Sequence, residues 1–191
     1  MGLLAVIFRP TQAIYRAGWV AFVMCLILLP GTVLRADPLE YSVKAAYLTK
    51  FGIYVEWPGA TFSSPDSPIN LCIAGDDPFG TTLDKAAANQ RVGARTVAIR
   101  RLKAVTRESG CHILYIGSAD PAYIQKAVEA IRGSPVLTVT DVDPAMAMGV
   151  INFVIQDNRV RFNVDEAAAV QNDLALSAKL LGLALNVKAR H

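Results

Sequence analysis

The alternation of strand-like and helix-like segments between residues 69 and 141 most constrains the fold of this 191-residue chain. Short apolar segments rich in β-branched residues predict strands, and amphipathic segments between them predict helices. Strands that alternate with helices are typical of a parallel sheet with crossover connections. The strand-like segments are residues 69–75, 95–102, 111–117 and 135–141, and the helix-like segments are residues 79–89 and 120–133. The pattern predicts a single α/β domain with a mostly parallel sheet.

A helix is also predicted directly before this alternation. Asp37 and Pro38 provide a capping carboxylate and a proline at the first helical position. Apolar residues then recur at spacings of three and four until Pro58, which ends the helix. The apolar residues expected on its buried face are Val43, Ala46, Tyr47, Phe51, Tyr54 and Val55.

The C-terminal part of the chain predicts a hairpin and a last helix. Residues 150–156 and 159–164 are strand-like and flank Asp157-Asn158, a pair that suits a two-residue turn. We expect an antiparallel hairpin at an edge of the sheet. Residues 165–185 predict one long helix.

The N-terminal segment has the layout of a signal peptide. Arg9 and Arg16 precede an uncharged apolar stretch, residues 17–29, and Pro30 follows it. We expect export to the periplasm, with cleavage after Ala36, which leaves residues 37–191 as the mature domain. The alternative is an uncleaved membrane anchor, which needs roughly 20 apolar residues.

Export would leave two cysteines, Cys72 and Cys111. An even number of cysteines in an oxidising compartment indicates one disulfide. Two buried free thiols are the alternative interpretation.

The charge pattern argues against a nucleic-acid partner. The 19 basic residues include three that precede Asp37, so residues 37–191 carry 16 basic and 16 acidic side chains. The middle of the chain nevertheless holds a basic run without acids, which indicates a solvated face or a contact for an acidic partner or anionic lipid. The run consists of Lys85, Arg91, Arg95, Arg100, Arg101, Lys103 and Arg107.

The sequence offers no catalytic, metal-binding or cofactor-binding set of residues. The loop from Gly75 to Gly80 lacks the glycine spacing and the lysine of phosphate loops, and its two aspartates would repel phosphate. The only histidines are His112 and His191, too few for a triad or a zinc site. Aspartate pairs at 76/77 and 141/143 adjoin prolines and suit turns and caps. We therefore predict a protein that is not an enzyme.

Four blocks carry a family resemblance. They are KAAYLTKFGIYVEWP, INLCIAGDDPFG, CHILYIGSAD and GVINFVIQDNRVRFNVD, which begin at residues 44, 69, 111 and 149. In this order and spacing they resemble the YfiR-like family of small periplasmic proteins, over residues 41–187. The family's cysteine pair corresponds to Cys72 and Cys111.

The resemblance implies a regulatory role. It implies a single α/β domain, usually a homodimer, that inhibits an inner-membrane diguanylate cyclase by binding its periplasmic region. Cyclic di-GMP signalling and biofilm formation would fall. Release would come from an outer-membrane partner, such as a lipoprotein, or from a redox change, and no catalytic residue is implied.

Two surfaces remain as candidate binding sites. Alternation along residues 159–164 turns Arg159, Arg161 and Asn163 outward, and with Lys179 they form a candidate partner surface or a merely solubilising one. A second function class is a small-ligand binding module, because parallel α/β sheets bind ligands at the carboxyl ends of their strands. Those ends carry Gly75-Asp76, Gly117-Ser118 and Asp141.

Overall fold

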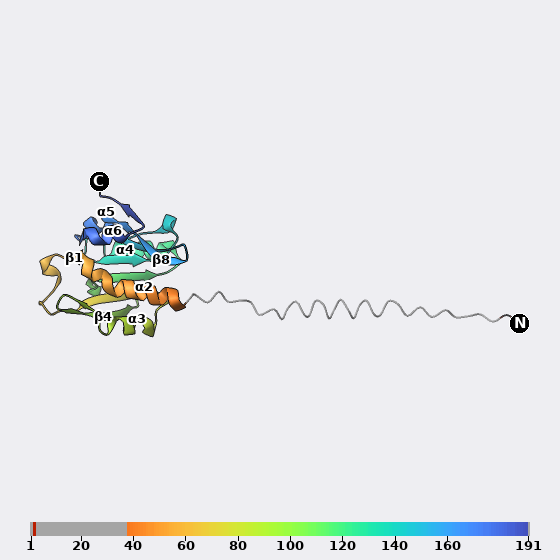
Figure 1. Ribbon diagram of the computed structural model, residues 1–191, viewed down its shortest axis with the longest axis horizontal. Coiled ribbons are helices and arrows are strands. Elements are labelled where there is room, and N and C mark those ends of the chain that lie inside the picture. The colour runs from red at the N-terminus through yellow and green to blue at the C-terminus, as the bar shows by residue number, and fades with distance from the viewer. Residues whose placement is uncertain (1, 3–37, 191) are drawn as a thin grey trace. The chain divides into compact units, whose positions relative to one another are not determined.

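The computed structural model describes residues 2 and 38–190 of the chain (Figure 1). The predicted signal peptide, residues 1–36, and the predicted helix cap at Asp37 lie outside the described residues, apart from Gly2.

The predicted mostly parallel sheet is confirmed. Neighbouring strands pair in parallel except β7 with β8 and β3 with β4. In spatial order the strands of this sheet are β10 (Asn186–Lys188), β8 (Arg159–Asp165), β7 (Ile151–Gln156), β6 (Leu137–Thr140), β5 (Ile113–Gly117), β2 (Ile69–Gly75), β4 (Arg95–Leu102) and β3 (Arg91–Val92). The predicted hairpin is confirmed as β7 and β8, whose turn residues Asp157 and Asn158 both have positive φ.

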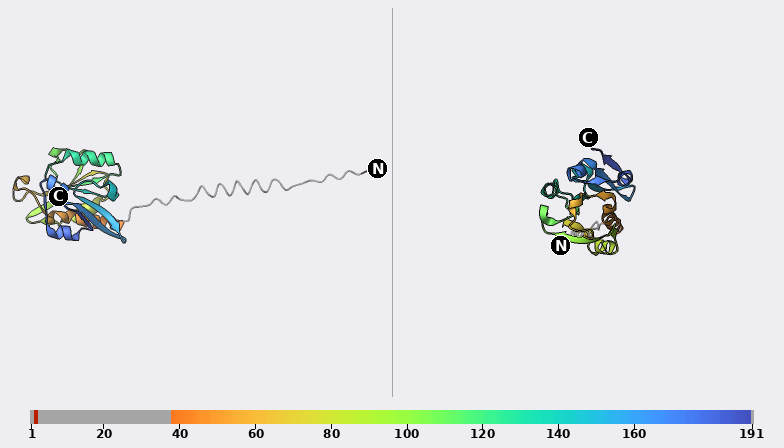
Figure 2. Two further views of the ribbon diagram at one scale, coloured as in Figure 1. Left: turned by 90° about the horizontal axis from the view of Figure 1, so that it is seen from above. Right: turned by 90° about the vertical axis from the view of Figure 1, so that its left-hand side faces the viewer.

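Helices cover both faces of this sheet (Figure 2). α2 (Pro38–Phe51), α3 (Thr81–Ala87) and α6 (Ala178–Leu183) contribute to one hydrophobic cluster, which contains Leu48, Leu83 and Leu180. α4 (Pro121–Ala130) packs on the opposite face, where Ile124 and Ala127 join the second cluster. The central strands are therefore buried on both sides, which explains their nearly continuous apolar sequences.

The buried face of α2 differs from the predicted one. Ala45, Leu48 and Phe51 are almost fully buried, whereas Val43 is exposed. Lys44 is buried beside them, and its charge is compensated by ion pairs. A buried ion pair is invisible to apolar periodicity, so the predicted face is displaced around the helix.

The helix also ends earlier than predicted. After Phe51 the chain forms a 3₁₀ turn (Gly52–Tyr54) and a short strand β1 (Val55–Glu56). β1 pairs antiparallel with β9 (Ala175–Leu176) in a separate two-stranded sheet. Further 3₁₀ turns are Gly59–Thr61, Arg107–Ser109 and Pro144–Met146.

The prediction of one long final helix is wrong. The chain forms α5 (Glu166–Gln171), β9, α6 and β10 instead. Asp173 has a φ of 56°, in the left-handed region that a helix cannot contain. Ser177 then caps α6, because its side chain accepts a hydrogen bond from the Leu180 amide.

The expectation that β8 lies at the sheet edge is also wrong for its second half. Residues Asn163 to Asp165 pair in parallel with β10. Lys188 of β10 adds an ion pair with Asp165, with 2.8 Å between Nζ and Oδ2. The final residues of the domain therefore cover a strand that sequence alone leaves exposed.

Candidate functional site

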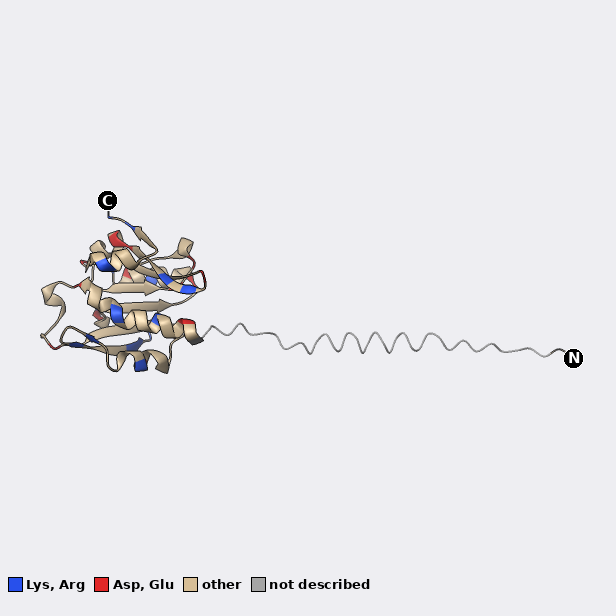
Figure 3. Ribbon diagram, viewed as in Figure 1, with Lys and Arg blue, Asp and Glu red and all other residues tan. Residues whose placement is uncertain are grey.

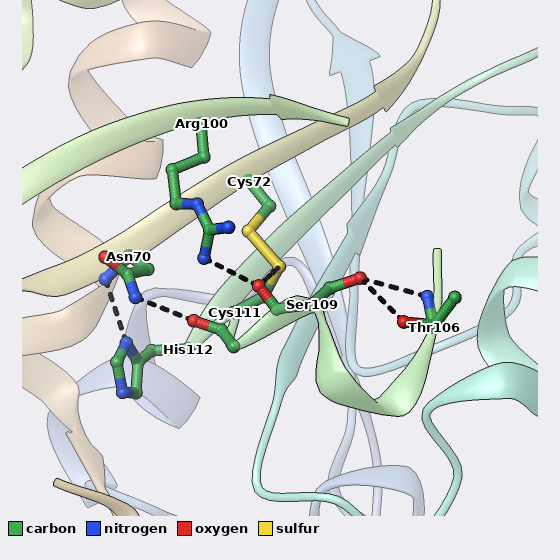
Figure 4. The surroundings of a disulfide bond; sticks show 8 residues. Asn70, Cys72, Arg100, Thr106, Ser109, Cys111 and His112 are labelled. Atoms are coloured by element: carbon green, nitrogen blue, oxygen red, sulfur yellow. Dashed lines mark hydrogen bonds between the residues drawn. A yellow bond between two sulfur atoms is a disulfide. The ribbon is translucent and has the colours of Figure 1, made fainter. Parts of the chain in front are cut away.

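The predicted disulfide is present between Cys72 and Cys111 (Figure 4). Cys72 is on β2, and Cys111 precedes the adjacent strand β5, with 5.8 Å between their Cα atoms. Cys72 is fully buried and Cys111 is nearly so. The bridge thus joins two neighbouring strands in the middle of the sheet and is largely shielded from water.

Hydrogen bonds fix the chain around this bridge (Figure 4). The Asn70 amide donates to His112 Nδ1 over 2.9 Å, and Asn70 Nδ2 donates to the Gly110 carbonyl over 2.7 Å. Arg100 donates to the Ser109 carbonyl over 2.6 Å. The loop before β5 is therefore held to β2 and β4 by side chains as well as by the disulfide.

His112 is part of this support. Its ring stacks on Phe62 with 4.6 Å between centroids. Burial lowers the pKa of His112, the charge of Arg95 lowers it further, and a bond to the Thr61 backbone opposes both. His112 Nδ1 accepts a hydrogen bond from the Asn70 backbone amide while the ring packs against Phe62.

The strand order creates a crevice at the carboxyl ends of β2 and β5. The helix that follows β2 packs on one face and leads to β4, and the helix that follows β5 packs on the other face and leads to β6. Neighbouring strands whose connections diverge form a topological switch point, where α/β proteins bind ligands. The crevice has a volume of about 270 Å³, and its lining includes Tyr41, Asp76, Tyr115, Ser118, Asp141 and Met146.

Two glycines allow the walls of this crevice to approach each other. The Asp76 amide donates to the Gly117 carbonyl over 2.6 Å. Gly75 has a φ of 78°, and a Cβ atom there would lie 2.2 Å from the Gly117 oxygen. The sequence prediction that Gly75-Asp76, Gly117-Ser118 and Asp141 meet at one end of the sheet is confirmed, since all but Gly75 line this one crevice.

A buried lysine supports the crevice from α2. Lys44 Nζ donates to Asp141 Oδ2 over 2.5 Å and also to Glu40. Burial would lower the pKa of Lys44, but its bonds to Asp141 and Glu40 outweigh that effect and raise it. Burial raises the pKa of Asp141, and Lys44 acts in the opposite direction. Apolar periodicity does not predict the Lys44–Asp141 pair. The only sequence signal for it is a lysine among the apolar positions of α2.

The predicted partner surface is divided by the structure. Arg159, Arg161 and Asn163 share the face of β8 that points away from Phe162 and its hydrophobic cluster. Asn163 Oδ1 accepts a hydrogen bond from Asn186 of β10. Lys179 is exposed on α6, which packs on the other side of the sheet, and its Nζ lies 5.8 Å from the Tyr54 ring centre.

Much of the basic run forms contacts within the fold. Figure 3 shows where lysines and arginines lie along the ribbon. Arg101 forms ion pairs with Asp77 at 2.7 Å and Asp84 at 3.0 Å. Arg95 donates to the Ser64 and Ser67 carbonyls. Arginines in such contacts brace loops against β4, so the sequence pattern overstates the charge that is free to bind a partner.

Helices on both faces of the large sheet, a disulfide between central strands and a crevice at the switch point define an α/β domain with a candidate ligand site. Within residues 38–190, no helix combines the length and hydrophobicity that crossing a bilayer requires. The same residues contain no group of three or more side chains suited to hold a metal ion.

The chain belongs to the YfiR/HmsC-like family, whose model matches residues 41–185. This match confirms the resemblance drawn from the four sequence blocks. The family consists of periplasmic regulators rather than enzymes, and it suggests regulation of a diguanylate cyclase. No curated protein is similar enough to the chain to count as a match.

Proposed function

We propose that this protein is a periplasmic regulatory binding protein that inhibits an inner-membrane diguanylate cyclase. It binds the periplasmic region of the cyclase and lowers the synthesis of cyclic di-GMP. The observation that carries the proposal is the family match over residues 41–185, which spans almost the whole described domain. The buried Cys72–Cys111 bridge supports the compartment, because such bonds persist in oxidising surroundings.

The outward face of β8 is the proposed contact for the cyclase. Arg159 is exposed and has no ion pair among the described residues, while Arg161 is half-buried on the same face. Asn163 extends this face toward β10, and Lys179 adds a separate cation on α6. Exposed cations without acidic partners favour an acidic surface on the cyclase and increase the association rate. In this proposal the protein acts as a homodimer. An outer-membrane lipoprotein relieves the inhibition of the cyclase by sequestering this protein.

Cyclic di-GMP in the native host tests the function. Deletion of the gene is expected to raise cyclic di-GMP, measured by mass spectrometry of cell extracts, and the wild-type gene is expected to restore the lower level. Unchanged cyclic di-GMP after deletion would contradict the proposed function.

Charge reversal tests the surface separately. Complementation with the double variant Arg159→Glu, Arg161→Glu should leave cyclic di-GMP high, because both charges would now repel an acidic partner. The matched control is Lys126→Glu, a reversal at an exposed lysine of α4, on which no interaction is proposed. Full repression by the double variant would refute this surface and leave the function standing. Immunoblots must show equal amounts of each protein.

A further inference from the structure

The crevice at the switch point has more acidic than basic groups. Asp76, Asp141 and Asp143 line it. No lysine or arginine is among its described lining residues. Asp141 is paired with Lys44, which also pairs with Glu40. Asp143 accepts from the Ala145 amide, whereas the Asp76 carboxylate has no hydrogen bond or ion pair within the described residues. The crevice therefore retains uncompensated negative charge.

An independent feature points into the same crevice. Tyr115 is only 2% exposed and lines the crevice, yet its hydroxyl has no hydrogen-bond partner among the described residues. Its ring is held edge-on against Phe79, with 4.8 Å between centroids. Thr61 Oγ1 is the one fully buried polar side-chain atom without a hydrogen-bond partner among the described residues. The Tyr115 hydroxyl, at the end of an otherwise buried ring, therefore reaches the accessible space of the crevice, where it can bond a ligand or water.

The electrostatic surroundings of Tyr115 specify the charge of that ligand. Burial raises the pKa of Tyr115, and Asp141, Tyr41, Asp77 and Asp76 raise it further. Three of these four neighbours are aspartates; Asp141 and Asp77 are paired with Lys44 and Arg101, whereas Asp76 is not paired with a cation among the described residues. Arg101, which lies beside Ile73 of β2 in the sheet register, is committed to Asp77 and Asp84. A ligand that donates hydrogen bonds and carries positive charge fits these acceptors.

The size and lining of the crevice specify its chemical class. A volume of about 270 Å³ is several times the roughly 30 Å³ that one water molecule occupies in the liquid. A bare inorganic cation would leave most of this space unfilled. Pro78, Val142 and Met146 add an apolar wall to the lining of the crevice. We propose that the crevice binds a small organic ammonium ion, with its N–H groups on Asp76 and the Tyr115 hydroxyl and its carbon chain against the apolar wall.

This site is separate from the proposed cyclase contact. The crevice lies at the carboxyl ends of β2, β5 and β6, whereas the basic face lies on β8. Loss of either function would leave the other measurable. The ligand site therefore does not depend on the regulatory proposal.

Titration with matched four-carbon probes tests the site. Protein expressed from the full-length gene is titrated with butylammonium, 1-butanol and butyrate, and binding is followed by calorimetry and by amide shifts of Gly117 and Ser118. Butylammonium should bind at least about ten-fold more tightly than butanol, because charge-assisted hydrogen bonds are stronger than neutral ones. Butyrate should not bind. Equal binding of butylammonium and butanol, or no saturable ammonium binding up to about 10 mM, would overturn the proposal.

Two conservative variants locate the contacts. Asp76→Asn and Tyr115→Phe should each weaken butylammonium binding about ten-fold. The matched controls are Asp66→Asn, in the exposed loop before β2, and Tyr47→Phe, on α2 against Phe153 and Phe162. Both controls should bind as the wild type does. Asp76 is exposed, so its variant decides the question even if Tyr115→Phe unfolds; unchanged binding by Asp76→Asn would refute the site.

Discussion

At the scale of single residues, Gly117 shows how closely β2 and β5 approach each other at their carboxyl ends. A Cβ atom at Gly117 would lie 2.0 Å from the Asp76 carbonyl oxygen. This oxygen belongs to the backbone and cannot move without displacing the wall of the crevice. The requirement for glycine therefore arises from a contact between segments about 40 residues apart.

Gly117→Ala is expected to lower the free energy of unfolding by about 2–3 kcal/mol, because the backbone must shift to relieve this overlap. Urea denaturation followed by circular dichroism measures the change. Gly182→Ala is the control: nothing lies within 4 Å of its Cβ position in α6. That substitution should raise stability by up to about 1 kcal/mol, as alanine favours helix. Equal stability of Gly117→Ala and wild type would refute the close approach.

His112 gives the protein a pH dependence of known sign. Burial lowers its pKa in the folded protein below the ordinary value of 6.5, and Arg95 adds to the effect. Below pH 6.5 the unfolded chain therefore binds a proton that the folded protein does not bind. The stabilisation that arises from this pKa difference is complete above pH 6.5. It is lost as the pH falls toward the pKa of His112 in the folded protein.

Replacing His112 should make the free energy of unfolding less dependent on pH. Unfolding free energies of wild type and His112→Asn, measured in urea on both sides of pH 6.5, should diverge in slope by at most about 1.4 kcal/mol per pH unit. The variant starts lower because it loses the Asn70 and Phe62 contacts, so the slope is the diagnostic quantity. Parallel profiles would show that His112 does not bind its proton differently in the two states.

At the scale of elements, the disulfide fastens two adjacent parallel strands that are far apart in sequence. Cys72 and Cys111 are separated by 39 residues, a segment that includes α3 and β4. The cross-link closes a loop in the unfolded chain and so reduces the conformational entropy of the unfolded state. The main effect of the bond is thus expected on the unfolded state.

The double variant Cys72→Ser, Cys111→Ser is expected to lose about 4 kcal/mol of unfolding free energy in the chain-entropy model. Wild type unfolded in the presence of reductant should lose a similar amount, which separates the bond from the effect of burying serine. A mass 2 Da lower for oxidised than for reduced wild type confirms the linkage. A double variant as stable as the oxidised wild type would contradict the role assigned to the disulfide.

The break between α5 and α6 is also an element-scale feature that substitution can test. Asp173 is exposed and has positive φ, which glycine adopts without steric cost. Asp173→Gly is expected to raise the unfolding free energy by about 0.5–1 kcal/mol. Gln171→Gly, in α5, should lower it by about 1 kcal/mol. Thermal and urea unfolding of both variants measures whether the two changes in unfolding free energy have opposite signs. A lower unfolding free energy for both variants would favour one continuous helix.

At the scale of the whole molecule, the N-terminal segment is expected to determine the compartment in which the domain operates. The basic flank and apolar stretch before residue 37 predict export and removal of the segment. Protein recovered from the periplasm should begin at Asp37, as shown by intact mass and N-terminal sequencing. Recovery of the uncleaved chain in the membrane fraction would establish the anchor instead.

The fold class was predictable because its signal is local and repeated. Each strand of the parallel core is a short apolar segment, and the helices between most of them show a different period. The turn at Asp157 and Asn158 defines the hairpin by itself, since both residues tolerate positive φ. The disulfide was predictable from the number of cysteines left in a chain that is expected to be exported. The carboxyl ends of the parallel strands were expected to meet, and the crevice lies there.

Long-range contacts decided what the sequence pattern did not. Lys44 interrupts the apolar face of α2 because Asp141, 97 residues away, compensates its buried charge. The segment after Asp165 has helical periodicity, but pairing with β1 and β8 divides it into two helices and two strands. Local periodicity determines which residues avoid water, and so it determined the sheet, its helices and the hairpin. Only the tertiary structure determined the partners of Lys44 and of the segment after Asp165. The energy of an ion pair or a strand pairing depends on groups that are not neighbours in the chain.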